Sequence, residues 1–264
     1  MRRDFNGNRI INNFKNMSDN NKTKQIVKKH YGKIAGGGGC CSCSCGSQTE
    51  NEQIAKSIGY SDEEIKSAGV ANLGLGCGNP TGMGEIKEGE TVLDLGSGAG
   101  FDCFLAVKKV GKSGKVIGVD MTEEMIKRAT DNAKKQGYDN VEFKLGDIEN
   151  LPIEDNSIDV VISNCVVNLA PDKLKVFKEV YRVLKKGGRI YISDIVLLDN
   201  LTKEQKENEE LIAGCVGGAL FKDDYLKIIK DAGFEVRILS EDKDISKRQY
   251  QGIPLESLKV EAKK

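Results

Sequence analysis

Three cysteines stand far apart in the chain, in contexts that could bring them to one chemical site. Cys77 lies in the glycine-rich stretch LGLGCGNP, Cys165 follows the apolar run VVISN, and Cys215 lies in AGCVGGALF. A single cysteine is most often a small buried apolar residue. A set of thiolates, in contrast, is the ligand type that selects soft ions. The sequence leaves two interpretations open, three separate packing residues or one soft-ion site.

The composition narrows the chemistry that the chain can perform. It has 264 residues, 40 basic and 40 acidic side chains, eight cysteines and a single histidine, His30. A neutral chain has no overall field that attracts nucleic acid or a membrane, and one histidine leaves little material for a catalytic dyad or a zinc site. No apolar run approaches the roughly 18 residues of a membrane span. We expect a cytoplasmic protein, in which the cysteines are thiols.

A glycine loop directly after a predicted strand is the second chemical feature. In VLDLGSGAGFD, Gly96, Gly98 and Gly100 fall between a strand at 91–95 and a helix at 101–110. Glycines at such a turn let the backbone approach a ligand, and the helix N-terminus offers free N–H groups. A dehydrogenase would place its third glycine one residue later and would need a partner for hydride transfer. A protein that binds adenosylmethionine fits the shorter spacing.

Acidic residues stand where a bound nucleoside would meet them. Asp94 precedes the glycine loop, and Asp120 ends the next predicted strand, where a carboxylate suits ribose hydroxyls. Asp147 and Ile148 follow the third strand and form an acidic and apolar pair that would meet adenine. Cys103, on the first helix, is expected to pack in the core.

Strands and helices alternate after residue 90. Buried strands are predicted at 91–95, 115–120, 141–145, 157–163 and 189–196. Helices are predicted between them, at 101–110, 122–135 and 172–185. A last region of helices and then strands follows, at 203–214, 222–231, 234–240 and 257–262. This alternation predicts an α/β fold with a Rossmann-like, doubly wound and mostly parallel sheet.

The residues before this core have a different character. A short helix is expected at 24–34, and GGGGCCSCSCGS at 36–47 is typical of a flexible tether. The Asn-rich residues 1–16 lack periodicity, and we expect Met17 to be the natural first residue.

The motifs over about residues 90–196 resemble those of the class I S-adenosylmethionine-dependent methyltransferases. The three cysteine contexts, with HYG at 30–32, resemble those of the arsenite methyltransferases over roughly residues 22–236. The resemblance implies S-adenosylmethionine as methyl donor and trivalent arsenic, held by Cys77, Cys165 and Cys215, as substrate. Arsenic is soft and keeps a lone pair when it binds three sulfurs, so no general base would be required. No permanently bound metal is expected.

The resemblance also implies roles for residues around the cofactor. Tyr31 and Gly32 would form a flap over it, and Asn164 would lie near its reacting end. The pocket would be lined by Asp94, Gly96, Gly98, Asp120, Met121, Asp147 and Ile148. Family members commonly pair the cysteine of the glycine-rich loop with an upstream cysteine, for which this chain offers Cys40, Cys41, Cys43 and Cys45. Cys45 is nearest to Cys77 in sequence, and an uninvolved tail is the alternative.

These expectations divide the chain into three parts: a flexible N-terminal segment at 1–49, a methyltransferase core at 50–198, and an arsenic-binding and sheet-completing region at 199–264. Thioredoxin or small thiols would restore the cysteines, and the protein would be a monomer. Two other functions stay open. One is a methylase of a small lipid or quinone, and the other is a thiol protein that binds soft metal ions.

Overall fold

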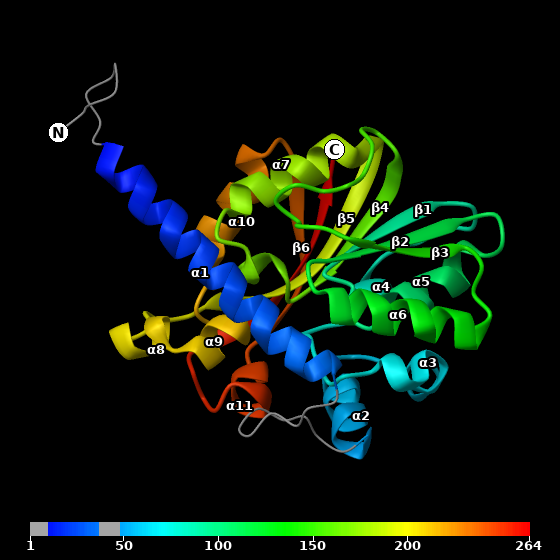
Figure 1. Ribbon diagram of the computed structural model, residues 1–264, viewed down its shortest axis with the longest axis horizontal. Helices are drawn as coiled ribbons and strands as arrows, with labels where there is room; N and C mark the ends of the chain where they lie inside the picture. Colours follow the sequence, from blue (N-terminus) through cyan, green and yellow to red (C-terminus); the bar gives the residue numbers. More distant parts are fainter. Residues whose placement is uncertain (1–9, 37–47) are drawn as a thin grey trace.

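A single sheet of seven strands forms the centre of the protein (Figure 1). The computed structural model describes residues 10–36 and 48–264. The strands are β1 (Thr91–Leu95), β2 (Lys115–Asp120), β3 (Val141–Leu145), β4 (Ile158–Asn164), β5 (Leu184–Leu197), β6 (Glu235–Asp242) and β7 (Leu255–Lys263). Their order is β3-β2-β1-β4-β5-β7-β6. β1 to β5 pair in parallel, whereas β7 runs antiparallel to β5 and β6, which confirms the predicted mostly parallel α/β sheet.

Helices cover the sheet and precede it in the chain. The N-terminal helices are α1 (Ile10–Ala35), α2 (Gln48–Ser57), α3 (Asp62–Ala68) and α4 (Pro80–Met83). Those that alternate with the parallel strands are α5 (Phe101–Val110), α6 (Glu123–Gln136) and α7 (Lys173–Val183). The C-terminal part adds α8 (Lys203–Glu207), α9 (Glu209–Ala213), α10 (Lys222–Asp231) and α11 (Ile245–Gln249). Short 3₁₀ turns occupy Gly69–Ala71 and Val167–Leu169.

The central strands of the sheet are buried on both faces, and their successive side chains point to opposite sides. On one face, Leu93 and Leu95 of β1 join Phe177 of α7 in a core cluster. On the other face, Val92 of the same strand packs with Cys103 of α5. Cys103 is therefore a core residue, as predicted. Burial from both sides is the usual state of a parallel sheet.

Two helices differ from their predicted limits. α1 begins at Ile10 rather than near residue 24, and residues 10–23 contain neither a glycine nor a proline that would interrupt the helix. The stretch predicted as one helix at 203–214 is divided at Asn208. The Asn208 side chain accepts hydrogen bonds from Glu210 N and Leu211 N and so caps α9 instead of continuing α8. In the described ranges, no helix combines the length and the apolar character that a membrane span requires.

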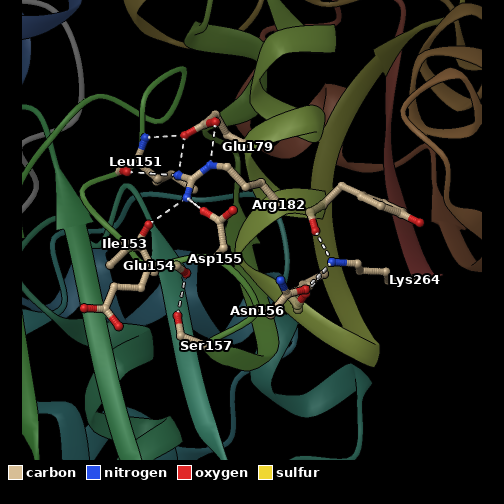
Figure 2. A network of polar contacts seen from close by, with 11 residues as sticks. Leu151, Ile153, Glu154, Asp155, Asn156, Ser157, Glu179, Arg182 and Lys264 are labelled. Carbon is tan, nitrogen blue, oxygen red and sulfur yellow. Dashed lines mark hydrogen bonds and ion pairs between the residues drawn. The ribbon is translucent and has the colours of Figure 1, made fainter.

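Arg182 of α7 fixes the loop that follows β3 (Figure 2). Its guanidinium donates to Leu151 O at 3.1 Å and to Ile153 O at 2.8 Å. It also pairs with Glu179 at 2.7 Å and Asp155 at 2.6 Å, and Glu179 accepts a further hydrogen bond from Leu151 N. The network holds the loop that carries the pair predicted to meet adenine.

We expect Arg182→Ala to lower the free energy of unfolding by about 1–2 kcal/mol, because two part-buried carbonyl groups lose their donor. Urea unfolding followed by circular dichroism measures the change. Lys203→Ala is the control, because Lys203 forms only an exposed ion pair with Glu207 at 3.9 Å. Its loss should change stability by less than about 0.5 kcal/mol. Equal effects of the two substitutions would contradict the role assigned to Arg182.

Candidate active site

A cavity of about 260 Å³ opens at the carboxyl ends of the parallel strands, where ligands bind in sheets of this kind. Most residues predicted to contact the cofactor line it: Tyr31, Asp94, Gly96, Gly98, Asp120, Met121, Asp147, Ile148 and Asn164. Cys165 and Cys215 line it as well. Gly32 does not line the cavity and lies instead against the Glu124 side chain of α6.

The loop after β1 requires glycine for steric reasons. Gly96, Gly98 and Gly100 have φ angles of 64°, 51° and 96°, in the left-handed region that favours glycine. A β-carbon at Gly96 would lie 2.6 Å from Val166 Cγ1. Asp120 supports the loop, because its carboxylate accepts a hydrogen bond from Gly98 N at 3.0 Å. The backbone can therefore approach a ligand in the cavity closely.

Two buried carboxyl groups line the cavity next to this loop. Burial raises the pKa of Asp94 well above its ordinary value, and Cys103 Sγ donates to its carboxylate at 3.2 Å. Burial raises the pKa of Asp102 to about 6, although Tyr60 Oη donates to its carboxylate at 2.6 Å. A cationic ligand would favour the ionised form of both groups. Asp102 was not predicted, although its place two residues after Gly100 is a usable signal.

Asn164, at the end of β4, connects the cavity to the loop that carries Cys77. Its Nδ2 donates to Gly78 O at 2.7 Å and to Tyr60 Oη at 3.0 Å. Its Oδ1 accepts from Cys77 N at 3.0 Å. A β-carbon at Gly76 would lie 2.7 Å from Asn164 Nδ2, so the loop can approach this side chain only with glycine there.

The structure brings the three predicted cysteines together. Cys77 Sγ and Cys165 Sγ lie within 4.8 Å of each other. Cys215 Sγ donates to Cys165 O at 2.6 Å. All three are free thiols with exposed fractions of 1%, 6% and 3%, and they belong to one apolar cluster. Cys77 is the innermost, because it lies behind the cavity wall while the other two form part of that wall.

The backbone at two of these cysteines is in an unusual conformation. Of the described non-glycine residues, four have a positive φ, and two of them are Cys165 at 58° and Cys215 at 70°. The left-handed region costs a non-glycine residue about 1–2 kcal/mol. Such strain persists where surrounding structure enforces it, and it is concentrated at functional sites. Cys165 is held by its N–H, which donates to Ser193 O at 2.8 Å.

The three thiols are neutral in this environment. Burial raises the pKa of Cys77 well above its ordinary value. The hydrogen bond to Cys215 and then burial raise the pKa of Cys165. Cys165 in turn lowers the pKa of Cys215, but burial outweighs this effect and the net shift is upward. A soft ion that binds here must therefore displace thiol protons.

A buried acid that the sequence did not reveal adjoins the cysteines. A carboxylate oxygen of Asp194 lies within 4.8 Å of both Cys77 Sγ and Cys165 Sγ. Tyr225 Oη donates to the same carboxylate at 2.9 Å. Burial raises its pKa to about 7. SDIV is typical of a strand interior, so no local pattern marks Asp194 as part of a site.

α1 closes one side of the cavity, lying beside α6 and α9 (Figure 1). Tyr31 Oη donates to Ala213 O at 3.2 Å. Lys24 Nζ lies 2.6 Å from Asp147 Oδ2 and 2.8 Å from Glu149 Oε2. Lys24 was not predicted, because a lysine on a basic helix is usually a solvated residue. The candidate Cys45 and its neighbours Cys40, Cys41 and Cys43 lie outside the described residues.

The chain is similar to a known domain family and to several methyltransferases. A family model described as a methyltransferase domain matches residues 86–233. The arsenite methyltransferase of Halobacterium salinarum is 47% identical over 233 residues, which are 82% of this chain and 58% of that protein. That of Aquipseudomonas alcaligenes is 43% identical over 168 residues, which are 61% of this chain and 49% of that protein. The chain spans about half the length of these curated relatives.

A solved structure agrees with these matches. The arsenic(III) S-adenosylmethionine methyltransferase from Chlamydomonas reinhardtii has a TM-score of 0.61 at 33% identity, covering 79% of this chain and 72% of that chain. The domain match and the sheet order together define the class as the class I S-adenosylmethionine-dependent methyltransferases. Within that class the chain belongs to the arsenite methyltransferase family, as the glycine loop and the three cysteine contexts predicted.

We expect a small alkylating reagent to react faster with the thiols that line the cavity than with a thiol enclosed in the core. Iodoacetamide should modify Cys165 and Cys215, which line the cavity, faster than the enclosed Cys103. All three rates should rise as the pH increases above 7, because their raised pKa values keep the thiols protonated. Peptide mass spectrometry after timed quenching measures the rates. Modification of Cys103 as fast as Cys165 would contradict the described cavity.

Proposed function

We propose that this protein transfers methyl groups from S-adenosylmethionine to trivalent arsenic held by the thiolates of Cys77, Cys165 and Cys215. The observation that carries the proposal is the meeting of three thiols from distant parts of the chain, two of them in the wall of one cavity and Cys77 directly behind it. The similarity to arsenite methyltransferases supports it. A lipid or quinone methylase would have no use for such a thiol cluster.

The thiols and their surroundings account for substrate binding. Each thiol gives its proton to a hydroxyl group of As(OH)₃, which leaves as water while an arsenic–sulfur bond forms. Three such exchanges leave arsenic with three sulfurs and a lone pair. Leu169, Ile195 and Val216 pack in the same cluster as the cysteines and exclude water from the bound arsenic.

The rest of the cavity would hold the methyl donor. Asp120 suits the ribose hydroxyls, and Asp147 with Ile148 suits adenine. The buried carboxyl groups of Asp94 and Asp102 suit the cationic methionine end, because a positive ligand favours their ionised forms. A donor held in this way would present its methyl group near the end of β4, where Asn164 and Cys165 lie.

The chemical step needs alignment and no proton transfer. The arsenic lone pair attacks the methyl carbon, the bond between that carbon and the sulfonium sulfur breaks, and S-adenosylhomocysteine leaves. Holding the two reactants in line is the main contribution of a protein to such a step. The methylated arsenic has then given up two electrons, which thioredoxin or small thiols would return.

The proposal extends to the organisation of the chain. Residues 199–264 contribute β6, β7 and Cys215, which supports their role as an arsenic-binding and sheet-completing region after a core at 50–198. The segment 1–49 would contribute the flap, since Tyr31 of α1 lines the cavity. A cytoplasmic monomer without a resident metal remains our expectation.

Incubation of the purified protein with S-adenosylmethionine, arsenite and a thiol reductant tests the function, with the arsenic species separated by chromatography. We expect monomethyl arsenic to accumulate with time. No methylated arsenic under conditions where calorimetry shows that S-adenosylmethionine binds would contradict the proposal.

Substitution of single cysteines should separate the methylation steps. Cys165→Ser and Cys215→Ser should each abolish methylation of both arsenite and monomethyl arsenic, because two thiolates are the fewest that can hold either substrate. Cys77→Ser should slow the first methylation more than the second, because monomethyl arsenic has only two positions left for sulfur. Rates measured separately with the two substrates provide the comparison. Equal losses in Cys77→Ser at both steps would contradict this division of roles.

A further inference from the structure

The short helix α11 reaches the cysteine cluster from the C-terminal part of the chain. It lies between β6 and β7, beyond the residues 86–233 that match the methyltransferase domain. Ile245, at its start, is fully buried in the apolar cluster that contains the three cysteines. Leu211 of α9, the helix that precedes Cys215, packs against the same cluster. No sequence motif indicated that this segment contributes to the site.

A tight turn after α11 places Tyr250 against the cavity. Tyr250 N and Gly252 N both donate to Ser246 O at 3.0 Å. Gln251 and Gly252 have φ angles of 51° and 81°, so two successive left-handed residues reverse the chain. The Ser246 hydroxyl closes the turn by donating to Ile253 O at 2.5 Å. As a result Tyr250 lines the cavity and packs against the cysteine cluster.

The Tyr250 hydroxyl lies at the sulfur of one proposed arsenic ligand. Its Oη is 3.7 Å from Cys165 Sγ, within the range of a hydrogen bond to sulfur. Burial and then the neighbouring Cys165 raise the pKa of Tyr250 well above its ordinary value, so the phenol keeps its proton. Gln249 lines the same cavity, and its Nε2 is buried without a hydrogen-bond partner. This side of the cavity therefore offers a ligand two hydrogen-bond donors, the Tyr250 hydroxyl and Gln249 Nε2.

We propose that Tyr250 is a positioning residue for arsenic, whose hydroxyl donates to Cys165 Sγ and fixes the direction of the arsenic–sulfur bond. The inference rests on the proposed function. A thiol can donate as well as accept, but a sulfur bound to arsenic can only accept. Cys77 and Cys215 lose their protons when they too bind the arsenic. The Tyr250 hydroxyl lies within hydrogen-bond range of Cys165 Sγ and keeps a proton that it can donate to this sulfur.

Tyr250→Phe tests the inference, because it keeps the ring and removes only the hydroxyl. The KM for arsenite should rise about fivefold, the size expected for the loss of one neutral hydrogen bond of about 1 kcal/mol. The KM for S-adenosylmethionine and the Tm should stay unchanged. Tyr138→Phe is the matched control, since the Tyr138 ring stacks on Phe104 in a cluster that contains none of the three cysteines. It should leave both KM values unchanged.

Two results would overturn the inference. One is a wild-type KM for arsenite in Tyr250→Phe. The other is a parallel loss of Tm and of S-adenosylmethionine affinity, which would show that the hydroxyl only stabilises the fold. If the wild-type protein transfers no methyl group, the proposed function is contradicted, and the role of Tyr250 is tested by arsenite binding instead. Calorimetry with arsenite alone then compares wild type with Tyr250→Phe, and equal affinities would overturn the role of Tyr250.

Discussion

The side chain of Asn164 joins the two halves of the site. Its Nδ2 donates to Gly78 O and its Oδ1 accepts from Cys77 N, so one amide group holds the backbone of the Cys77 loop. The next residue in the chain is Cys165. The same amide donates to Tyr60, which donates in turn to Asp102 in the wall of the cavity. The innermost thiol is therefore held in a fixed relation to the carboxyl end of β4. In the proposed reaction, the alignment of methyl donor and acceptor would depend on this relation.

Burial sets the protonation of the thiols and of the carboxyl groups around the cavity. It keeps the thiols protonated and raises the pKa values of Asp94, Asp102 and Asp194, so this environment disfavours charge. A cationic methyl donor would favour the ionised form of the buried carboxyl groups. A soft ion would replace the protons of the buried thiols. The backbone at Cys165 and Cys215 is strained where these two residues line the cavity, and such strain persists only where the surrounding structure enforces it.

The sequence predicted those parts of the structure that depend on short-range patterns. The strand–helix alternation, the glycine loop and the acids at the strand ends are local signals, and the sheet and cavity follow them. The three cysteines could be connected only through family resemblance, because no spacing shows that Cys77 and Cys215 meet Cys165. Asp194 and Tyr250 were missed for the same reason, since one lies inside an ordinary strand and the other after a turn without periodicity. The extent of α1 was also wrong, because residues 10–23 contain no glycine or proline that would stop the helix before its predicted start.

X-ray absorption spectroscopy at the arsenic edge tests the central claim, that three thiolates hold the substrate. The protein should carry serine in place of Cys40, Cys41, Cys43 and Cys45, so that only the described cysteines can bind, and it should be loaded with arsenite without methyl donor. The account predicts three sulfur ligands and no oxygen around arsenic. In the further variant Cys77→Ser it predicts two sulfurs and one oxygen. Oxygen ligands in the first protein, or an unchanged sulfur shell in the second, would contradict it.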